Sequence, residues 1–325
     1  MKRREFLHSA LVLPAGALAG AGLAPLAGCA HKPTAPAAPG PAAPSPAAPP
    51  VAAASPEVAV CAGNDPYAQT LKAIDALGGM GQFVKPGQSV VLSPNLAFAR
   101  RPEQGAATHP RVLRAVLDAC QKAGAGQVVV LDFVLDARDV TFKVTGAQAA
   151  LEGTNVSFIS PDTVDQYKKF DVSRLPIHAA HHIEQAIANQ VLAADVLINM
   201  PVIKHHGGSM MSGALKKNMG LVWLRKAYHD ADLHGCIAEL STVIQPHLVV
   251  ADATRVLQTN GPSGPGELTH PKQVLAARNQ VLADAYACRY LNGALKPTDI
   301  PHVVQAAKLN GVADLTNFRI VEVTL

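Results

Sequence analysis

Apolar residues after position 57 follow two spacings, and these predict alternating strands and helices. Continuous apolar runs predict buried strands at residues 89–92, 127–131, 195–199 and 248–251, and a last strand, at a sheet edge, at residues 318–323. Apolar residues three and four positions apart predict helices at residues 110–123, 181–193, 233–244 and 281–291. Thr108 is expected to cap the first of these helices, and Gly124 to end it.

Strands that alternate with helices of this length indicate βαβ units. They predict an α/β fold with a mostly parallel sheet flanked by helices. Residues 57–325 are enough for one large domain, or for two lobes with a crevice at the carboxyl ends of the strands.

Residues 1–29 have the pattern of an export signal rather than of a folded element. Arg3 and Arg4 precede Phe6 and a weakly apolar run, which is typical of a twin-arginine signal. The run ends in residues 26–29, Leu-Ala-Gly-Cys, which resemble a lipoprotein box. We therefore expect the twin-arginine export machinery as a partner, a lipid anchor on Cys29, and a periplasmic or outer-membrane-attached lipoprotein. Ordinary cleavage beside an unmodified cysteine is the alternative.

Residues 30–56 consist mainly of Ala, Pro and Ser and show no apolar periodicity. Such a composition predicts an extended, semi-rigid linker between the signal and the folded part of the chain.

Charge and composition exclude several classes of partner and cofactor. Without residues 1–28, which hold three basic residues and one acidic residue, the formal net charge falls from +4 to +2. A nearly neutral chain with 4% aromatic residues gives no support to a nucleic-acid partner. The cysteines lack any Cys-x-x-Cys spacing, so neither a zinc ribbon nor an iron–sulfur cluster is expected.

Several predicted strands are followed directly by polar residues. Asn95, Asp132 and Asp252 come after three of them, and a fourth runs into Lys204 and His206. In open parallel sheets, ligands bind in the crevice beyond the carboxyl ends of the strands, so these side chains are expected to share one crevice. The alternative is that each polar residue caps the following helix or turn.

The segment from residue 204 to residue 220 is the densest cluster of chemically active side chains. Gly207 and Gly208 allow backbone N–H groups to approach an anion. Lys204, His206 and Lys217 are the candidate catalytic residues, because lysine and histidine can exchange protons and neutralise phosphate or carboxylate. His205 and His206 are candidate metal ligands. A flexible loop with solvated lysines is the alternative.

Two further motifs receive a weaker interpretation. His178 and His182 would share a helix face, but without a His-Glu-x-x-His motif a solvated helix start is favoured. The Gly- and Pro-rich residues 261–266 are expected to form a rigid lip beside the crevice, and they match neither a Walker loop nor a dinucleotide fingerprint.

The chain resembles a family known as domain of unknown function 362. The resemblance rests on residues 84–87, 94–95, 108–110, 127–132, 195–201, 217–218 and 260–264, together with Lys204, His206, Asp252 and Asp284. Together with the strand-end residues and the Gly-rich segment, these motifs lead us to expect that a cofactor is held by Asn95, Thr108, His109, Asp132, Gly207, Gly208, Asn218 and Asp252. The chain departs from the family at Ser93, where many members have Lys, and it lacks the cysteine module of some members.

This family is distantly similar to the lactate racemases, which hold a nickel-pincer nucleotide. The similarity implies a transition metal or a nickel-pincer-like nucleotide as cofactor, and a racemase-like, isomerase-like or oxidoreductase-like reaction on a small anionic metabolite. A non-catalytic, lipid-tethered envelope protein that binds a metal, a cofactor or a cell-wall component is the alternative.

Overall fold

The structure is a computed structural model that describes residues 57–325. The expected signal at residues 1–29 and the expected linker at residues 30–56 lie outside the described residues. Within the described part of the chain, no helix is both long enough and apolar enough to cross a membrane.

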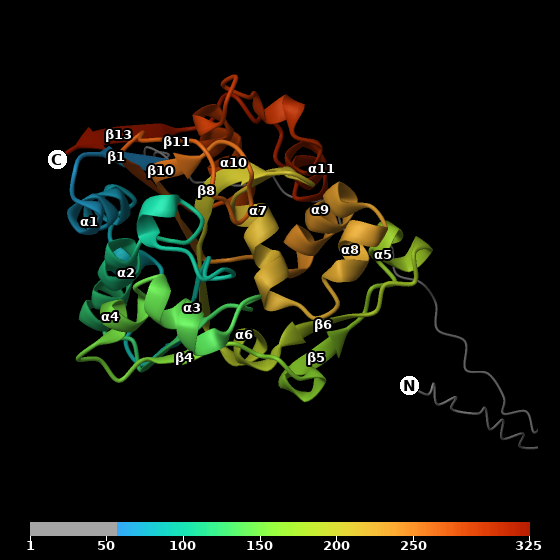
Figure 1. The fold of residues 1–325 in the computed structure, drawn as a ribbon, viewed down its shortest axis with the longest axis horizontal. Helices are drawn as coiled ribbons and strands as arrows, with labels where there is room; N and C mark the ends of the chain where they lie inside the picture. The colour runs from blue at the N-terminus through green and yellow to red at the C-terminus, as the bar shows by residue number, and fades with distance from the viewer. Residues whose placement is uncertain (1–56) are drawn as a thin grey trace, which may run out of the picture. The chain divides into compact units, whose positions relative to one another are not determined.

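The strands and helices alternate along most of the chain (Figure 1). The strands are β1 (Val58–Ala62), β2 (Ser89–Pro94), β3 (Gln127–Leu131), β4 (Ser157–Ile159), β5 (Tyr167–Phe170), β6 (Gln185–Ala188), β7 (Val196–Met200), β8 (Val202–His206), β9 (Met210–Ser212), β10 (Leu248–Leu257), β11 (Leu268–Thr269), β12 (Gln273–Ala277) and β13 (Ile320–Thr324). The helices are α1 (Pro66–Ala76), α2 (Pro110–Lys122), α3 (Arg138–Val144), α4 (Ala147–Leu151), α5 (Pro176–Ala180), α6 (Asn189–Ala193), α7 (Ala214–Lys217), α8 (Lys226–Asp230), α9 (Leu233–Val243), α10 (Gln280–Ala287) and α11 (Pro301–Leu309).

The main sheet has the strand order β13-β1-β12-β10-β7-β2-β3-β4. Its neighbours run parallel from β10 to β4, and β12 is antiparallel to both β1 and β10. The expected α/β fold, with a mostly parallel sheet flanked by helices, is therefore confirmed. From β2 the chain moves outward through β3 and β4 and later returns to β7, on the other side of β2. The carboxyl ends of β2 and β7 thus form a topological switch point, where ligands bind in this class of fold.

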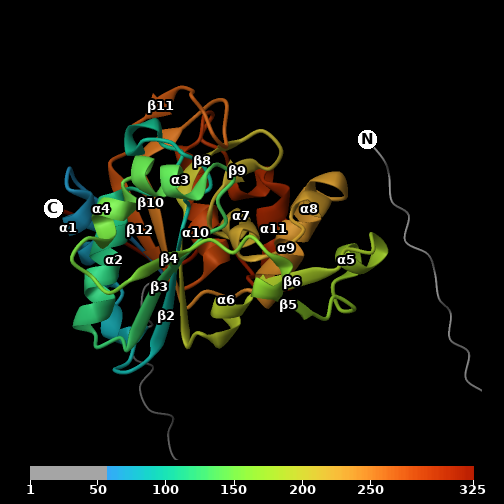
Figure 2. The same ribbon diagram turned by 60° about the horizontal axis from the view of Figure 1, so that its bottom comes forward.

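Helices cover both faces of the sheet (Figures 1 and 2). On β2, Val90 and Leu92 pack on the face covered by α1, α2 and α4. Val91 points to the opposite face, into the core formed with α7, α9, α10 and α11. Because both faces are covered, the strand is a continuous apolar run rather than an alternating one.

Two local predictions are wrong. The helix predicted over residues 181–193 is strand β6 followed by the short helix α6, because residues 185–188 pair with β5 in a separate two-stranded sheet. The Gly-rich loop expected within residues 204–220 contains strand β9, which forms a hairpin with β8, and β8 also pairs with β10. In both places strand pairing overrides the local pattern.

The helix predicted from Pro110 is present, but its cap differs from the expectation. His109 occupies the N-cap of α2, and its Nδ1 accepts a hydrogen bond from the Arg111 backbone N–H at 3.1 Å. Thr108 instead joins β2 to β7, since its hydroxyl donates to the Met200 carbonyl at 2.7 Å.

Candidate active site

A cavity of about 760 Å³ lies at the carboxyl ends of β2 and β3. Asn95 and Asp132 reach it directly after these strands, and β8 contributes Lys204 and His206. Much of the rest of its wall is formed by residues 223–226 and by Lys216, Lys217, Met219 and Gly220. The sequence predicted this convergence at the sheet edge, and the structure brings these four side chains to one cavity.

Lys217 is fixed at the floor of the cavity by a buried ion pair. Its Nζ donates to Asp132 Oδ1 at 3.0 Å and to Ser93 Oγ at 2.6 Å. The other oxygen of Asp132 accepts from the Leu96 backbone N–H at 2.6 Å. A Cβ at Gly220 would lie 2.3 Å from Asp132 Oδ1, so only glycine allows the chain to pass this pair. Ser93, where the sequence departs from the family, is therefore a hydrogen-bond partner of Lys217.

Lys204 is buried in the cavity wall without a carboxylate partner. Its side chain is 1% exposed, its Nζ donates to the Ala106 carbonyl at 2.6 Å, and it lies 5.6 Å from the centre of the Phe98 ring. Burial removes the hydration of the ammonium group and lowers the pKa of Lys204 to about 7, with Lys216 adding repulsion.

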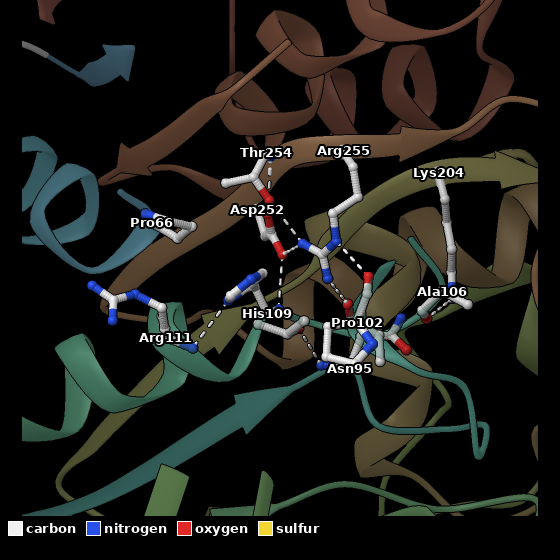
Figure 3. A network of polar contacts seen from close by, with 12 residues as sticks. Pro66, Asn95, Pro102, Ala106, His109, Arg111, Lys204, Asp252, Thr254 and Arg255 are labelled. Carbon is white, nitrogen blue, oxygen red and sulfur yellow. Dashed lines mark hydrogen bonds and ion pairs between the residues drawn. The ribbon is translucent and has the colours of Figure 1, made fainter. Parts of the chain in front are cut away.

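A clamp outside the cavity holds residues 102–109, the loop whose Ala106 carbonyl accepts the hydrogen bond from Lys204 (Figure 3). Arg255 donates to the carbonyls of Pro102 and Ala107, at 2.6 and 2.8 Å, and its guanidinium pairs with Asp252. Burial opposes ionisation of Asp252, but the Arg255 guanidinium and the hydrogen bonds from Thr254 together outweigh it and hold the pKa of Asp252 below its usual value. The same carboxylate also accepts from the His109 backbone N–H at 2.8 Å.

Three of the residues expected to hold a cofactor have a structural role instead. Thr108, His109 and Asp252 do not line the cavity. They shape residues 102–109, whose Ala106 carbonyl orients Lys204. Asp252 lies inside β10 rather than after the end of a strand, and it organises the distant backbone of residues 102–109 rather than capping the next helix or turn.

His206 faces the cavity as a neutral hydrogen-bond donor. Its Nδ1 accepts from the backbone N–H groups of Gly208 and Ser209, at 3.0 and 3.1 Å, so the ring proton resides on Nε2. Burial, with repulsion from Lys216, lowers the pKa of His206 to about 3. Gly208 thus contributes a backbone N–H group to the imidazole and does not line the cavity itself.

His205 and His206 do not form a joint metal site. They alternate along β8, and His205 Nδ1 accepts from the Gly261 backbone N–H at 3.2 Å. A neutral imidazole binds a metal through the nitrogen without a proton, and the protein contacts place a proton on Nε2 of both rings. Among residues 57–325, no three His, Cys, Asp or Glu side chains lie close enough together to hold a metal ion. The expected metal stays a prediction that these two side chains do not support.

Two further cations reach the cavity, and the sequence analysis had not assigned a role to Arg225. Burial lowers the pKa of Lys216 to about 8, with Arg225 adding repulsion. Burial also lowers the pKa of Arg225, whose guanidinium lies 3.1 Å from the centre of the Phe133 ring. Within the described residues, neither Lys216 nor Arg225 has a carboxylate at ion-pair distance.

Asn218 and Gly207 also lie away from the large cavity. Asn218 is fully buried and hydrogen-bonds Gln280 and Asn199, at 2.7 and 3.1 Å, which secures the turn after α7. Gly207 borders a smaller cavity of about 190 Å³. Pro262, in the expected lip, does line the large cavity.

The wall formed by residues 223–230 was not predicted from the sequence. This segment contributes Trp223, Leu224, Arg225, Lys226, His229 and Asp230. Trp223 is the single tryptophan of the chain, and Arg225 follows two positions later. This combination of an aromatic residue and a cation is the feature of the sequence that could have indicated the wall.

The histidine at position 178 is structural. It is fully buried, and its ring nitrogens contact Glu239 at 2.6 Å and Tyr228 at 2.9 Å. Tyr228 lies on α8, so this contact anchors the segment that forms the wall. The predicted solvated helix start is wrong, because α5 packs against α9 and encloses His178.

Comparison with protein families identifies the relatives of the chain. The model of the domain of unknown function 362 matches residues 90–289. The chain belongs to this family. The matched range contains Asn95, Asp132, Lys204, His206 and Arg225, so the cavity lies within the family domain.

A thylakoid-associated protein of Synechocystis sp. is a curated relative of this chain and is 27% identical to it over 197 residues. The match covers 58% of this chain and 59% of that protein, so the chain spans about three fifths of the length of this relative.

Two solved structures are similar to part of this chain. The lactate racemase apoprotein from Thermoanaerobacterium thermosaccharolyticum has a TM-score of 0.47 and 11% identity, covering 71% of this chain and 56% of that one. A Thermotoga maritima protein has a TM-score of 0.45 and 13% identity, covering 70% and 59%.

Proposed function

We propose that the cavity binds an organic anion and that Lys204 exchanges a proton with it. The supporting observation is the convergence of Lys204, Lys216 and Arg225, which lack a carboxylate at ion-pair distance within residues 57–325. Burying unpaired positive charge is unfavourable, and an anion would remove that cost. An anionic ligand is therefore the natural complement of this site.

The residues differ in what they can do to such a ligand. Lys204, with a pKa of about 7, populates both protonation states near neutral pH, which suits a general acid or base. His206 stays neutral, and its Nε2–H group can donate to an oxygen that gains negative charge. Lys217 is paired with Asp132, so its charge is already balanced within the site.

The residues of this site fit only the anionic part of a nucleotide-type cofactor, which is its phosphate. Lys216 and Arg225 would hold its phosphate, and the cofactor would supply redox or electrophilic chemistry when bound. The cavity histidine does not fit as a metal ligand, because its Nδ1 accepts two backbone hydrogen bonds. Proton exchange by Lys204 on a small anionic metabolite is the step that the residues themselves support, and it corresponds to isomerase-like chemistry.

Calorimetric titration of the full chain with inorganic phosphate and with ADP tests the binding site. We expect the Lys216→Met variant to lose about tenfold in affinity, and Lys308→Met, a change at an exposed lysine on α11, to have no effect. An anion raises the pKa of nearby lysines, so binding at pH 7.5 should take up protons, which titrations in buffers of different ionisation enthalpy measure. Equal affinities in the two variants would contradict the proposal.

Proton exchange is tested separately from binding. The full chain is incubated in D₂O with a panel of 2-hydroxy and 2-amino acids, and deuterium incorporation is followed by NMR. Incorporation that is lost in Lys204→Met supports the enzyme. Anion binding without any exchange would favour the non-catalytic binding protein.

A further inference from the structure

The charged and apolar side chains of the cavity lie at different depths. Lys204 and Lys217 are 1% and 5% exposed, whereas Leu135 and Leu224 are 59% and 50% exposed. All four line the same cavity. A site for a small hydrophilic anion needs no exposed apolar residues at its mouth. The combination of buried lysines and exposed leucines therefore indicates a ligand that also has an apolar part.

Aromatic rings also line the cavity. The centre of the Phe98 ring lies 5.6 Å from Lys204 Nζ, and the centre of the Phe133 ring lies 3.1 Å from the Arg225 guanidinium. Phe98 thus lies beside a buried cation of the inner zone, and Phe133 lies beside the half-buried Arg225. Trp223 extends the same wall and packs against the Tyr167 ring, with centroids 5.2 Å apart.

The cavity mouth carries one ion pair and one further carboxylate, Asp162, which is exposed. Lys226 and Asp230 are exposed and form an ion pair with each other. The two rim leucines lie in backbone segments that the fold holds in place. The Leu135 backbone N–H donates to the Ala97 carbonyl at 2.7 Å, and Leu224 has a φ of +52°, which is rare for leucine. An exposed leucine held in an unfavourable backbone conformation is a feature of binding sites.

From these observations we infer that the anion of this site is amphiphilic. One phosphate or carboxylate head would reach Lys204, Lys216 and Arg225, and an apolar body, such as an alkyl chain, would lie along the aromatic wall toward Leu135 and Leu224. The inference rests on the proposed function and adds the class of ligand. A cavity of about 760 Å³ accommodates a molecule of this size, whereas a small inorganic anion would leave its apolar wall in water.

A series of alkyl phosphates tests the inference. The full chain is titrated calorimetrically with inorganic phosphate, butyl phosphate and octyl phosphate, each below its critical micelle concentration. Each buried CH₂ group contributes about 0.8 kcal/mol, or about fourfold in affinity, so octyl phosphate should bind at least about tenfold more tightly than butyl phosphate. Octyltrimethylammonium, which has the same tail and the opposite charge, should not bind.

Neutral substitutions at the rim locate the apolar body. Leu135→Asn and Leu224→Asn should each weaken octyl phosphate binding about threefold or more and leave butyl phosphate binding unchanged. The matched control is Leu309→Asn, because Leu309 on α11 is 49% exposed and does not line the cavity. An equal loss in this control, or equal affinities for the two alkyl phosphates, would overturn the inference.

The outcomes separate this inference from the proposed function. If all three phosphates bind equally and Lys216→Met abolishes their binding, the anion site stands and the amphiphilic ligand is wrong. If none of them binds, both are wrong. Binding of octyltrimethylammonium as tight as that of octyl phosphate would also overturn the inference.

Discussion

Two lysines 13 positions apart show how surroundings alone assign different roles to one residue type. Lys217 donates to Asp132 and Ser93, and a carboxylate balances its charge in the interior. Lys204 donates to a single backbone carbonyl, and burial lowers its pKa to about 7. Desolvation without a counter-charge shifts a lysine toward its neutral form. The residue that titrates near neutral pH is therefore the one without an ion pair.

The first prediction concerns this lysine and the pH dependence of stability. The pKa of Lys204 is about 7 in the folded chain, against 10.5 for an ordinary lysine. Between these values the unfolded chain binds more protons, so raising the pH should stabilise the fold by about 1 kcal/mol per pH unit. Lys204→Met should remove this contribution. Urea denaturation at pH 7, 8.5 and 10 measures it, with Lys308→Met as the control. Parallel pH profiles for wild type and Lys204→Met would contradict the assignment.

At the scale of elements, buried carboxylates position the cavity without lining it. Asp284 on α10 accepts from the backbone N–H groups of Ala214 and Leu215, at 2.6 and 3.0 Å, and so fixes the start of α7. That short helix carries Lys216 and Lys217. Asp252 and Arg255 on β10 perform the same task for residues 102–109.

The second prediction tests the clamp on β10. Arg255→Met leaves the Asp252 carboxylate buried without a cation and should destabilise the fold by about 3–5 kcal/mol. The double variant Asp252→Asn/Arg255→Met should recover part of the loss. The control is Arg111→Met, because Arg111 and Asp65 form an exposed pair that should contribute less than about 1 kcal/mol. Urea denaturation measures all three, and an equal effect of the two arginine substitutions would argue against the clamp.

The sequence predicted elements that depend on local pattern and failed where pairing is distant. Residues 127–131 form β3 with the predicted bounds, and α2 begins at Pro110, because a continuous apolar run and an amphipathic stripe are local signals. Residues 202–206 form β8, which pairs with the nearby β9 in a hairpin and also with β10, about 50 residues away, and no local pattern encodes the second pairing.

The candidate site was predicted in part for the same reason. Asn95, Asp132, Lys204, His206 and Lys217 follow or occupy strands and turns whose ends meet at one sheet edge. Arg225 and Trp223 enter the cavity because Tyr228 docks on buried His178, a tertiary contact across 50 residues. The sequence suggested Asp252 as a ligand because only the structure shows that its carboxylate pairs with Arg255.

At the scale of the whole molecule, the cavity lies where the direction of strand addition reverses. β2 precedes β3 and β4 on one side, and β7 and β10 lie on its other side. The connections that follow β2 and β7 therefore diverge at the carboxyl ends of these strands. This divergence leaves room for the side chains of β8. The family domain matches residues 90–289, which includes both sides of this opening.

The third prediction concerns the part of the chain outside the described residues. If Cys29 carries lipid, the full chain expressed with its own signal should sediment with membranes, and Cys29→Ser should move it to the soluble fraction. Arg3→Lys/Arg4→Lys should retain the protein inside the cytoplasm, which cell fractionation and immunoblotting detect. Unchanged fractionation of both variants would refute the twin-arginine lipoprotein.

Pairing at one edge of the sheet has a consequence for biosynthesis. β1 is flanked by β12 and β13, both from the end of the chain, and the Leu325 backbone N–H donates to the Ala62 carbonyl at 3.1 Å. On the ribosome, β1 emerges well before β12 and β13, because most of the domain lies between them in the sequence. A nascent chain that has not yet reached these two strands therefore has no native partner for β1, and this edge of the sheet is completed late in the folding of the domain.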